Sequence, residues 1–246
     1  MTEPRFFVSP DAIHGSRVTF SPEQSRQIAR VLRLLPGAAV LVLDNTGYLH
    51  TVRLERVHPR QTVGFIVDTQ EAGNEPPITV VLYQALLKGE RMDFVLQKGT
   101  EIGVTQFVPI LTERTVVRRT EKRGRWERIV IEAAEQCRRG RLPEIGDILT
   151  FEEALAHARN TAVRLIAHNA VDVLPWKEIR RQYPEQPPSV ALFIGPEGGF
   201  TEAEVTQARA WGVSPVHLGP RTLRAETAAL VALTLVLYHW GDIGVI

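Results

Sequence analysis

The sequence predicts an α/β protein in which a small β-rich domain precedes a larger domain of alternating strands and helices. Beyond residue 78, apolar runs of strand length alternate with stretches of helical periodicity, a pattern typical of a mostly parallel sheet. Before residue 70, several short strands separated by turn residues favour a small barrel. The segment 71–77 (EAGNEPP) has no periodicity, so we expect domains at 1–72 and 73–246.

One helix is expected among the N-terminal strands. Ser21 is a suitable N-cap, Pro22 occupies the first helical position, and Gln24 completes a capping box. Apolar residues then continue at helical spacing as far as Leu35, where a Pro-Gly pair stops the helix. Three strand-like runs follow, at 38–43, 48–57 and 61–67.

The second domain shows a regular alternation of elements. Apolar runs predict strands at 78–83, 107–111, 163–167, 190–194 and 216–218. Periodic segments predict helices at 90–102, 125–137, 151–158, 202–211 and 225–239. The run VALFI at 190–194 is apolar throughout, as expected of a central strand that is buried on both faces.

Composition disfavours several classes of protein. No apolar run approaches the roughly 20 residues that span a bilayer, and residues 1–10 lack the features of a secretory signal. The single cysteine, Cys137, allows neither an intrachain disulfide nor a cysteine metal cluster. The seven histidines are scattered without ligand spacing, so no metal is expected. A cytoplasmic location follows as the default.

Positive charge is concentrated in one region of the chain. The formal net charge is only +1, yet segment 114–141 contains ten Arg or Lys and four Glu, a local net charge of +6. Such a basic island in an otherwise acidic chain is typical of a localised contact with a polyanion such as RNA. The alternative is a solvated helix face whose charges pair with one another.

Two glycine-containing loops each connect an apolar strand to a helix. GPEGGF at 195–200 follows the strand at 190–194 and precedes a capping box at 201–204. LGPRTLRAET at 218–227 repeats this arrangement before the last helix. Because the carboxyl ends of parallel strands meet at one edge of a sheet, the two loops could form two walls of one cleft. Each could equally be a plain strand-to-helix turn.

The chemistry of the loops disfavours a phosphate-bearing ligand. They contain neither a Walker sequence nor GxGxxG. Glu197 would repel a polyphosphate, so a neutral or cationic ligand such as S-adenosylmethionine (SAM) fits better. In the second loop, Arg224 and Glu226 place opposite charges at the mouth of the cleft, although Glu226 could simply favour the helix N-terminus and pair with Arg224.

These two loop sequences resemble those of the ribosomal RNA small-subunit uridine N3-methyltransferases (the RsmE family) of the SPOUT superfamily. Two positions depart from the family pattern: Gly99, where alanine is usual, and Arg30, where histidine is expected. Further segments resemble family motifs in the same order: Arg5-Phe6-Phe7, Val31-Leu32-Arg33, Pro36-Gly37, Lys88, 97–103 (QKGTEIG), Glu113-Arg114 and 132–137 (EAAEQC).

The resemblance implies a fold and a reaction. The N-terminal domain should be a PUA-like or OB-like β-barrel that helps to bind RNA, and the second a SPOUT domain with a C-terminal trefoil knot. The protein should be a homodimer with its SAM sites near the dimer interface. The implied reaction is methylation of N3 of one uridine in 16S ribosomal RNA, on an assembled small subunit.

Candidate site residues follow from the loops and the resemblance together. We expect Arg139 or Arg224 to stabilise the developing uracil anion and Glu226 to act as general base. His168 and Asn169, at the end of an apolar strand, could line the pocket or merely cap the strand. The expected SAM-binding residues are His168, Asn169, Ile194, Gly195, Pro196, Glu197, Gly198, Gly199, Leu218, Gly219, Pro220, Leu223, Arg224, Ala225 and Thr227.

RNA contacts are expected mainly from arginines. Phe6 or Phe7 could stack on a base or pack in the barrel core, and Cys137 should pack as a small apolar residue because N3 methylation needs no cysteine nucleophile. The expected RNA-binding residues are Arg5, Phe7, Arg33, Lys88, Lys98, Arg114, Arg118, Arg119, Arg125, Arg138, Arg139 and Arg141.

Three other functions fit parts of the pattern. A different SPOUT enzyme would use the same cofactor on a ribose hydroxyl or a guanine. A non-catalytic ribosome-assembly factor would bind the subunit without SAM. A nucleotide-dependent oxidoreductase would need a dinucleotide-binding sequence, which the chain lacks.

Overall fold

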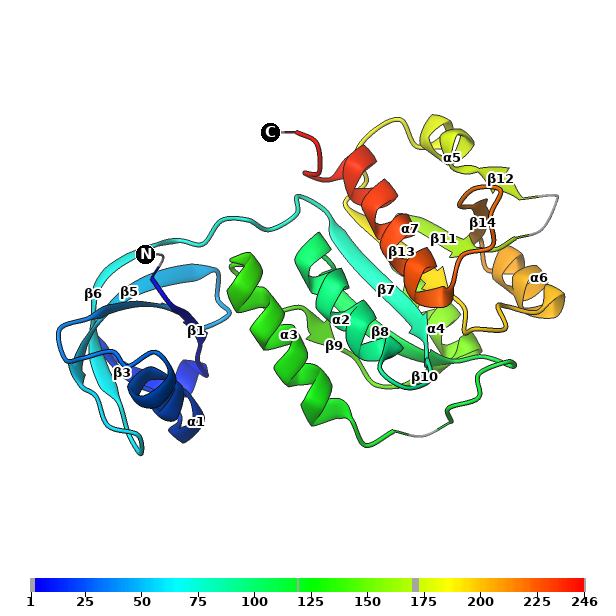
Figure 1. Ribbon diagram of the computed structural model, residues 1–246. Coiled ribbons are helices and arrows are strands. Elements are labelled where there is room, and N and C mark those ends of the chain that lie inside the picture. The colour runs from blue at the N-terminus through cyan, green and yellow to red at the C-terminus, as the bar shows by residue number, and fades with distance from the viewer. Residues whose placement is uncertain (1–2, 119, 170–172, 246) are drawn as a thin grey trace. The chain divides into compact units, whose positions relative to one another are not determined.

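The computed structural model describes residues 3–118, 120–169 and 173–245. The chain divides into two compact units (Figure 1). The N-terminal unit consists of residues 1–75 together with 134–142, and the C-terminal unit of residues 76–133 and 143–246. The N-terminal unit therefore includes a short segment from the middle of the chain.

A curled six-stranded sheet forms the N-terminal unit, in the order β1-β4-β5-β6-β3-β2. The pair β1–β4 is parallel and the other pairs are antiparallel. Alternate residues of β4 and β5, such as Val40, Val42, Val52 and Leu54, point into the core. The elements are β1 (Arg5–Phe7), η1 (Pro10–Ala12), β2 (Ile13–His14), β3 (Arg17–Thr19), α1 (Pro22–Arg26), η2 (Gln27–Val31), β4 (Ala39–Leu43), β5 (Tyr48–Arg56) and β6 (Val63–Glu71).

The helix expected to reach Leu35 is shorter than the sequence predicted. The capping box of Ser21 and Gln24 forms, but α1 ends at Arg26 and passes into the π-helical turn η2. Arg33 then adopts a positive φ of 52°, which ends helical geometry. The prediction was wrong because the apolar residues beyond Ile28 were counted as one buried face, whereas Leu35 is exposed.

The C-terminal unit is built on an eight-stranded parallel sheet. Its order is β10-β8-β7-β13-β11-β14-β12, and β9 also pairs with β8. The strands are β7 (Thr79–Ala85), β8 (Gln106–Leu111), β9 (Glu144–Ile145), β10 (Leu149–Thr150), β11 (Val163–Ala167), β12 (Leu174–Pro175), β13 (Ser189–Ile194) and β14 (Ser214–His217). The helices are α2 (Arg91–Ile102), α3 (Arg123–Cys137), α4 (Phe151–His157), η3 (Ala158–Asn160), α5 (Trp176–Gln182), α6 (Glu202–Ala210) and α7 (Ala225–Trp240).

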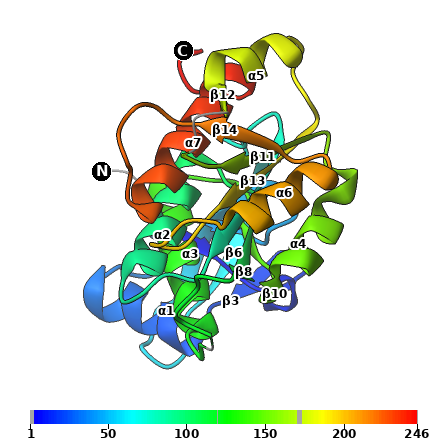
Figure 2. The ribbon, with the colours of Figure 1, turned by 90° about the vertical axis from the view of Figure 1, so that its right-hand side faces the viewer.

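Helices cover both faces of the parallel sheet, as Figure 2 shows for α2 and α7 on one side and α4 and α6 on the other. Successive residues of β7 face opposite layers, so Leu82 packs in the cluster with α2 and α7, and Tyr83 in the cluster with α4 and α6. This double burial explains the unbroken apolar run of β13. The strands β9, β10 and β12 were not predicted, because a strand of two residues shows no hydrophobic periodicity. The helix α5, of seven residues, was not predicted either.

The strand order places three strand ends next to one another. Strand β13 pairs with β7 on one side and with β11 on the other, and β11 pairs with β14. All these pairs are parallel, so β11, β13 and β14 end at the same edge of the sheet. Both glycine-containing loops leave the sheet at that edge.

Candidate functional site

A cavity of about 380 Å³ lies at the edge where β11, β13 and β14 end. It is formed by the segment after β11, the loop after β13 and the loop after β14. Its lining residues are Arg114, Ala167, His168, Asn169, Ile194, Gly195, Pro196, Glu197, Gly198, Gly199, Phe200, Leu218, Arg221, Thr222, Leu223, Ala225 and Ala228. The structure therefore brings together the two loops that the sequence singled out.

The first loop is a tight turn that depends on its glycines. The Gly199 amide donates to the Pro196 carbonyl at 2.9 Å, and Gly199 has a φ of 67°, which glycine adopts without strain. A Cβ on Gly195 would lie 3.1 Å from the Gly199 backbone. The loop ends at Thr201, whose capping box with Glu204 starts α6 as predicted. Backbone atoms rather than large side chains thus form this wall.

Arg114 packs against the first loop and forms a hydrogen bond with its backbone. Its Nη1 donates to the Gly198 carbonyl oxygen at 2.8 Å, and a Cβ on Gly198 would lie 3.3 Å from the Arg114 side chain. Arg114 was expected to bind RNA, and it lies at the cavity. Its side chain is exposed, so a guanidinium group stands at the opening.

Glu197 connects the first loop to the start of α2 through hydrogen bonds. Its Oε1 accepts from the Lys88 amide at 3.0 Å and from Arg91 Nη1 at 2.8 Å. Burial by itself raises the pKa of Glu197, but the hydrogen bonds from the backbone and Arg91 outweigh burial, so the pKa lies below its usual value. Because Arg91 neutralises this carboxylate, repulsion of a phosphate by Glu197 is weaker than the sequence suggested.

Arg91 also faces the second loop, and sequence reasoning missed it. Its Nε lies 3.7 Å from Glu226 Oε1, so one arginine connects Glu197 and Glu226. The other oxygen, Glu226 Oε2, is buried and has no hydrogen-bond partner among the described residues. The expected pair of Arg224 with Glu226 is not present in the described part of the chain, and Arg224 is exposed at the N-cap of α7.

Most of the expected SAM-binding residues line the cavity, and four do not. Those outside it are Gly219, Pro220, Arg224 and Thr227. Gly219, with a φ of 127°, shapes the second loop, and its amide donates to His217 Nδ1 at 3.0 Å. His168 lines the cavity and also contacts Glu202 at 3.2 Å. Besides Arg114, the lining residues that were not among the expected SAM-binding residues are Ala167, Phe200, Arg221, Thr222 and Ala228.

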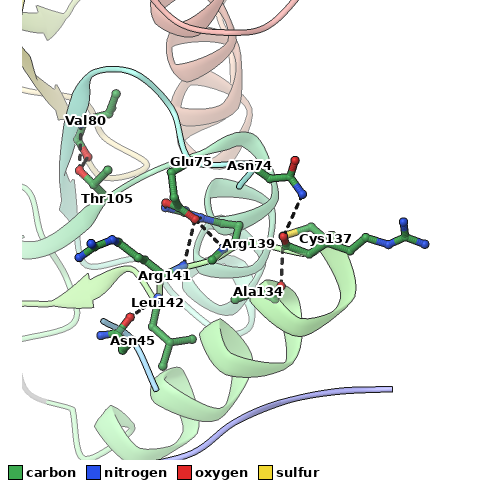
Figure 3. A network of polar contacts seen from close by, with 12 residues as sticks. Asn45, Asn74, Glu75, Val80, Thr105, Ala134, Cys137, Arg139, Arg141 and Leu142 are labelled. Carbon is green, nitrogen blue, oxygen red and sulfur yellow. Dashed lines mark hydrogen bonds and ion pairs between the residues drawn. The ribbon is translucent and has the colours of Figure 1, made fainter. Parts of the chain in front are cut away.

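Arg139 is a buried structural residue of the N-terminal unit. It is 3% exposed, and its Nη2 donates to Glu75 Oε2 at 2.6 Å (Figure 3). Glu75 Oε1 accepts from Arg139 Nε at 3.2 Å and from the amides of Gly140 and Arg141 at 2.9 and 3.1 Å. Arg139, which was expected to have catalytic and RNA-binding roles, does not line the cavity, and its guanidinium group is paired with Glu75.

Other expected RNA contacts in the N-terminal unit are also buried or engaged. Phe6 and Phe7 are 1% and 6% exposed, so both are unavailable to stack on a base. Arg5 donates to the Arg138 carbonyl at 3.3 Å, and its pKa is lowered by burial and by the charge of Arg138. Arg33, by contrast, is exposed.

Much of the basic island is occupied by internal contacts. Arg125 pairs with Asp93 at 2.8 Å, and Arg123 pairs with Glu127 and Asp147. Arg118 donates to the Glu113 carbonyl, Arg141 to the Thr46 carbonyl, and outside the island Lys98 pairs with Glu101. Arg119 lies outside the described residues. The local charge of +6 therefore overstates how many free cations the island offers.

Within the described ranges, no group of three or more His, Cys, Asp or Glu side chains could hold a metal ion. In the same part of the chain, no helix is long and apolar enough to cross a membrane.

Comparisons with known proteins agree in pointing to RNA modification. The RNA methyltransferase domain family matches residues 74–237. A ribosomal RNA small subunit methyltransferase E from Synechocystis is 36% identical over 94% of this chain and 76% of its own length. The protein of that name from Bacillus subtilis is 30% identical over 88% of each chain.

Solved structures show the same architecture. A ribosomal RNA small subunit methyltransferase E from Neisseria gonorrhoeae, bound to S-adenosyl methionine, aligns with a TM-score of 0.87 and 35% identity over 98% of this chain and 100% of its own. A methyltransferase from Legionella pneumophila, in complex with the bound cofactor SAM, aligns with a TM-score of 0.89 and 35% identity over 99% and 100%. The α/β methyltransferase fold with a parallel sheet is thereby established.

Glu197→Gln should lower the free energy of unfolding by less than about 1 kcal/mol near neutral pH, because the ion pair with Arg91 is partly exposed. A carboxylate whose folded pKa is depressed contributes stability above its unfolded pKa and loses it as pH falls through the folded pKa. The difference between wild type and variant should therefore vanish on acidification below the usual pKa of 4.5. Urea unfolding at several pH values measures this difference in the free energy of unfolding. Glu185→Gln, which replaces an exposed glutamate, is the control. A difference that persists in acid would contradict this role of the carboxylate.

Glu75→Gln should lower the free energy of unfolding by roughly 2–4 kcal/mol, because it removes the carboxylate that pairs with the buried Arg139 guanidinium. The double variant Glu75→Gln/Arg139→Met should recover part of the loss, since no uncompensated buried charge remains. Denaturant unfolding of the wild type and the three variants forms a double-mutant cycle. Equal stability of Glu75→Gln and wild type would show that the pair is dispensable for folding.

Proposed function

This chain belongs to the ribosomal RNA small subunit methyltransferase E family, and from that premise we propose that it methylates 16S ribosomal RNA with SAM as methyl donor. We further propose that the target atom is N3 of one uridine and that the substrate is the assembled small subunit. The observation that carries the proposal is the cavity at the ends of β11, β13 and β14, which both glycine-containing loops enclose.

The residues of the cavity fit a nucleoside cofactor without phosphates. Gly195 and Gly198 form a close-packed backbone wall in which a Cβ would lie within 3.3 Å of another atom. Ile194, Leu218 and Leu223 supply apolar surface for a purine ring. The volume of about 380 Å³ lies in the range of pockets that bind small molecules.

When bound, SAM supplies an electrophilic methyl group, and the protein must position the acceptor and remove its proton. Glu226 is the best-placed proton acceptor, because its Oε2 is buried and has no hydrogen-bond partner among the described residues. Arg91, 3.7 Å from Glu226, holds that carboxylate in place. Arg224, exposed between the lining residues Leu223 and Ala225, can reach a developing negative charge on the uracil oxygens.

Three further features belong to the same proposal. Strands β13 and β14 both enter the sheet between strands formed by earlier segments, which supports a knotted SPOUT topology for residues 73–246. The exposed Tyr238 on α7 and Phe94 on α2 support a homodimer through these helices. We assign residues 1–72 to a PUA-like or OB-like RNA-binding domain, and the substrate places the enzyme in the cytoplasm.

Gly195→Val should weaken binding of S-adenosylhomocysteine at least about hundredfold, because the new side chain would collide with the Gly199 backbone and displace the loop. Isothermal titration calorimetry measures the change. Gly124→Ala is the matched control, since a Cβ there meets nothing within 4 Å. A wild-type protein that binds 16S RNA but not the cofactor would instead be a non-catalytic assembly factor.

Glu226→Gln should lower the single-turnover rate of methyl transfer to small subunits by about 10²–10⁴, the usual contribution of a general base. Glu152→Gln, in the first turn of α4, is the matched control and should retain the wild-type rate. Mass spectrometry of nuclease digests identifies the methylated atom. A product methylated on a ribose or a guanine would overturn the uridine assignment, and a wild-type rate for Glu226→Gln would remove it as the base.

A further inference from the structure

A second hollow, here called the α5 groove, lies between α5 and the C-terminal end of α7 and has a volume of about 660 Å³. Figures 1 and 2 both show these two elements next to one another. Its lining residues are Trp176, Lys177, Arg180, Arg181, Pro184 and His239. None of these six residues lines the cavity at the strand ends, so the α5 groove is separate from the site already described.

Hydrogen bonds and ring contacts hold the walls of the α5 groove together. Trp240 Nε1 donates to the Tyr183 carbonyl at 3.1 Å, and Gln186 Nε2 donates to the Trp240 carbonyl at 2.7 Å. The rings of Trp176 and His239 stack, with centroids 5.9 Å apart and an interplanar angle of 14°. The segment that follows α5 is therefore attached to the end of α7, and the groove is part of the folded unit.

The α5 groove carries positive charge that a ligand can reach. Lys177 and Arg180 are exposed, and neither has a hydrogen bond or an ion pair with another residue in the described part of the chain. Arg181, by contrast, pairs with Glu178 at 2.7 Å. Burial and the charge of Arg180 lower the pKa of His239, because both disfavour its protonated form. An anion in the groove would relieve this repulsion.

The indole of Trp176 offers a donor that lacks an acceptor. The residue is 8% exposed, and its Nε1 is buried without a hydrogen-bond partner among the described residues. A buried N–H group without an acceptor costs free energy, so it calls for a partner from outside the protein. This observation is independent of the charges, and it points to the same kind of ligand, one that carries oxygen acceptors.

We propose that the α5 groove binds a backbone phosphate of the RNA substrate and so gives the C-terminal unit an RNA contact away from the cavity. Lys177 and Arg180 bind the phosphate oxygens through charge-assisted hydrogen bonds, and Trp176 Nε1 donates to one of these oxygens. The inference rests on the proposed function, because the phosphate belongs to the substrate of that enzyme.

Helix α7 connects the α5 groove to the cavity at the strand ends. Ala225, its first residue, lines the cavity, and His239, in its last turn, lines the groove. At a rise of about 1.5 Å per residue, the 16 residues of α7 span ~24 Å. The phosphate in the groove therefore does not belong to the nucleotide that is methylated. The groove contributes to substrate affinity and takes no part in methyl transfer.

Other occupants fit the α5 groove less well. A free mononucleotide carries the same phosphate, but the ring of Trp176 is buried and stacks on His239, so it offers no free face to a base. A stable protein interface needs roughly 20–30 residues on each side, and six residues line the groove. The phosphate of a longer RNA needs neither an aromatic face nor a large interface.

Two changes separate the charges from the buried donor. Lys177→Ala/Arg180→Ala should weaken binding of a 16S RNA transcript about tenfold and reduce the slope of log affinity against log salt by about 1.4, because two phosphate contacts are lost. Trp176→Phe removes the N–H and keeps an aromatic ring, so it should weaken binding about threefold without changing that slope. Both should raise KM for small subunits and leave kcat unchanged.

A titration of His239 by NMR checks that RNA occupies the α5 groove itself. A phosphate beside the imidazole favours its charged form, so the pKa of His239 should rise when a single-stranded RNA oligonucleotide binds. Lys177→Ala/Arg180→Ala should abolish this rise between the free and the bound protein.

Matched controls come from the same unit. Arg159→Ala replaces another exposed arginine, in η3, and Trp211→Phe removes another indole N–H outside the groove. Both should keep wild-type RNA affinity. Lys177→Ala/Arg180→Ala should keep the wild-type free energy of unfolding, because both side chains are exposed, so this variant tests the proposal even where Trp176→Phe is less stable.

Four results would overturn the proposal. Wild-type affinity and salt dependence of Lys177→Ala/Arg180→Ala would remove the groove from RNA binding. An equal effect of Arg159→Ala would show that only total charge matters. A response of His239 to inorganic phosphate or AMP, with unchanged RNA affinity of the double variant, would assign the groove to a small anion. A lower oligomeric mass of the double variant would assign it to an interface between copies.

The proposal and the proposed function fail in different experiments. RNA affinity and the titration of His239 are measured without SAM and without methyl transfer. An enzyme that bound RNA through the α5 groove but did not methylate 16S RNA would refute the proposed function and support the phosphate contact.

Discussion

The position of β13 in the parallel sheet is the constraint on which the rest of the C-terminal unit depends. By pairing with β7 and β11 at once, it sets the level at which three neighbouring strands end. The two glycine-containing loops then start beside one another although about 20 residues separate them in sequence. Helices α6 and α7 begin directly after these loops, so the same pairing also fixes where the two helices start.

Local signals made the main elements and the loops predictable. An apolar run, a glycine turn and a capping box lie within 15 residues around Gly195, and each acts on its immediate neighbours, so the sequence alone located the first wall of the cavity. The second wall followed from the same pattern around Gly219. That the two walls enclose one space depends on strand order, which no local pattern encodes; the sequence suggested one cleft only through the rule that parallel strands end at one edge of a sheet.

Contacts between distant residues, and one backbone conformation, account for what the sequence did not predict. Glu197 was read as a free carboxylate because its partner Arg91 lies 106 positions earlier, at the start of α2. The pairing of Arg139 with Glu75 could not be predicted from its motif, because Glu75 precedes it by 64 positions. Leu35 was placed on a helix because spacing cannot show that Arg33 leaves helical geometry. In each case the residue type indicated the chemistry of the side chain, but a distant partner or the local backbone conformation determined what the side chain contacts.

Charge illustrates why partners decide function. A count of arginines and lysines selects the segment 114–141 as the strongest candidate for RNA contact, yet Arg123, Arg125 and Arg139 already have carboxylate partners. An arginine held in such a pair must lose that partner before it gains a phosphate, which offsets much of the new interaction. The number of arginines in the segment 114–141 therefore overstates the charge that it offers to RNA, because the fold has already neutralised part of that charge.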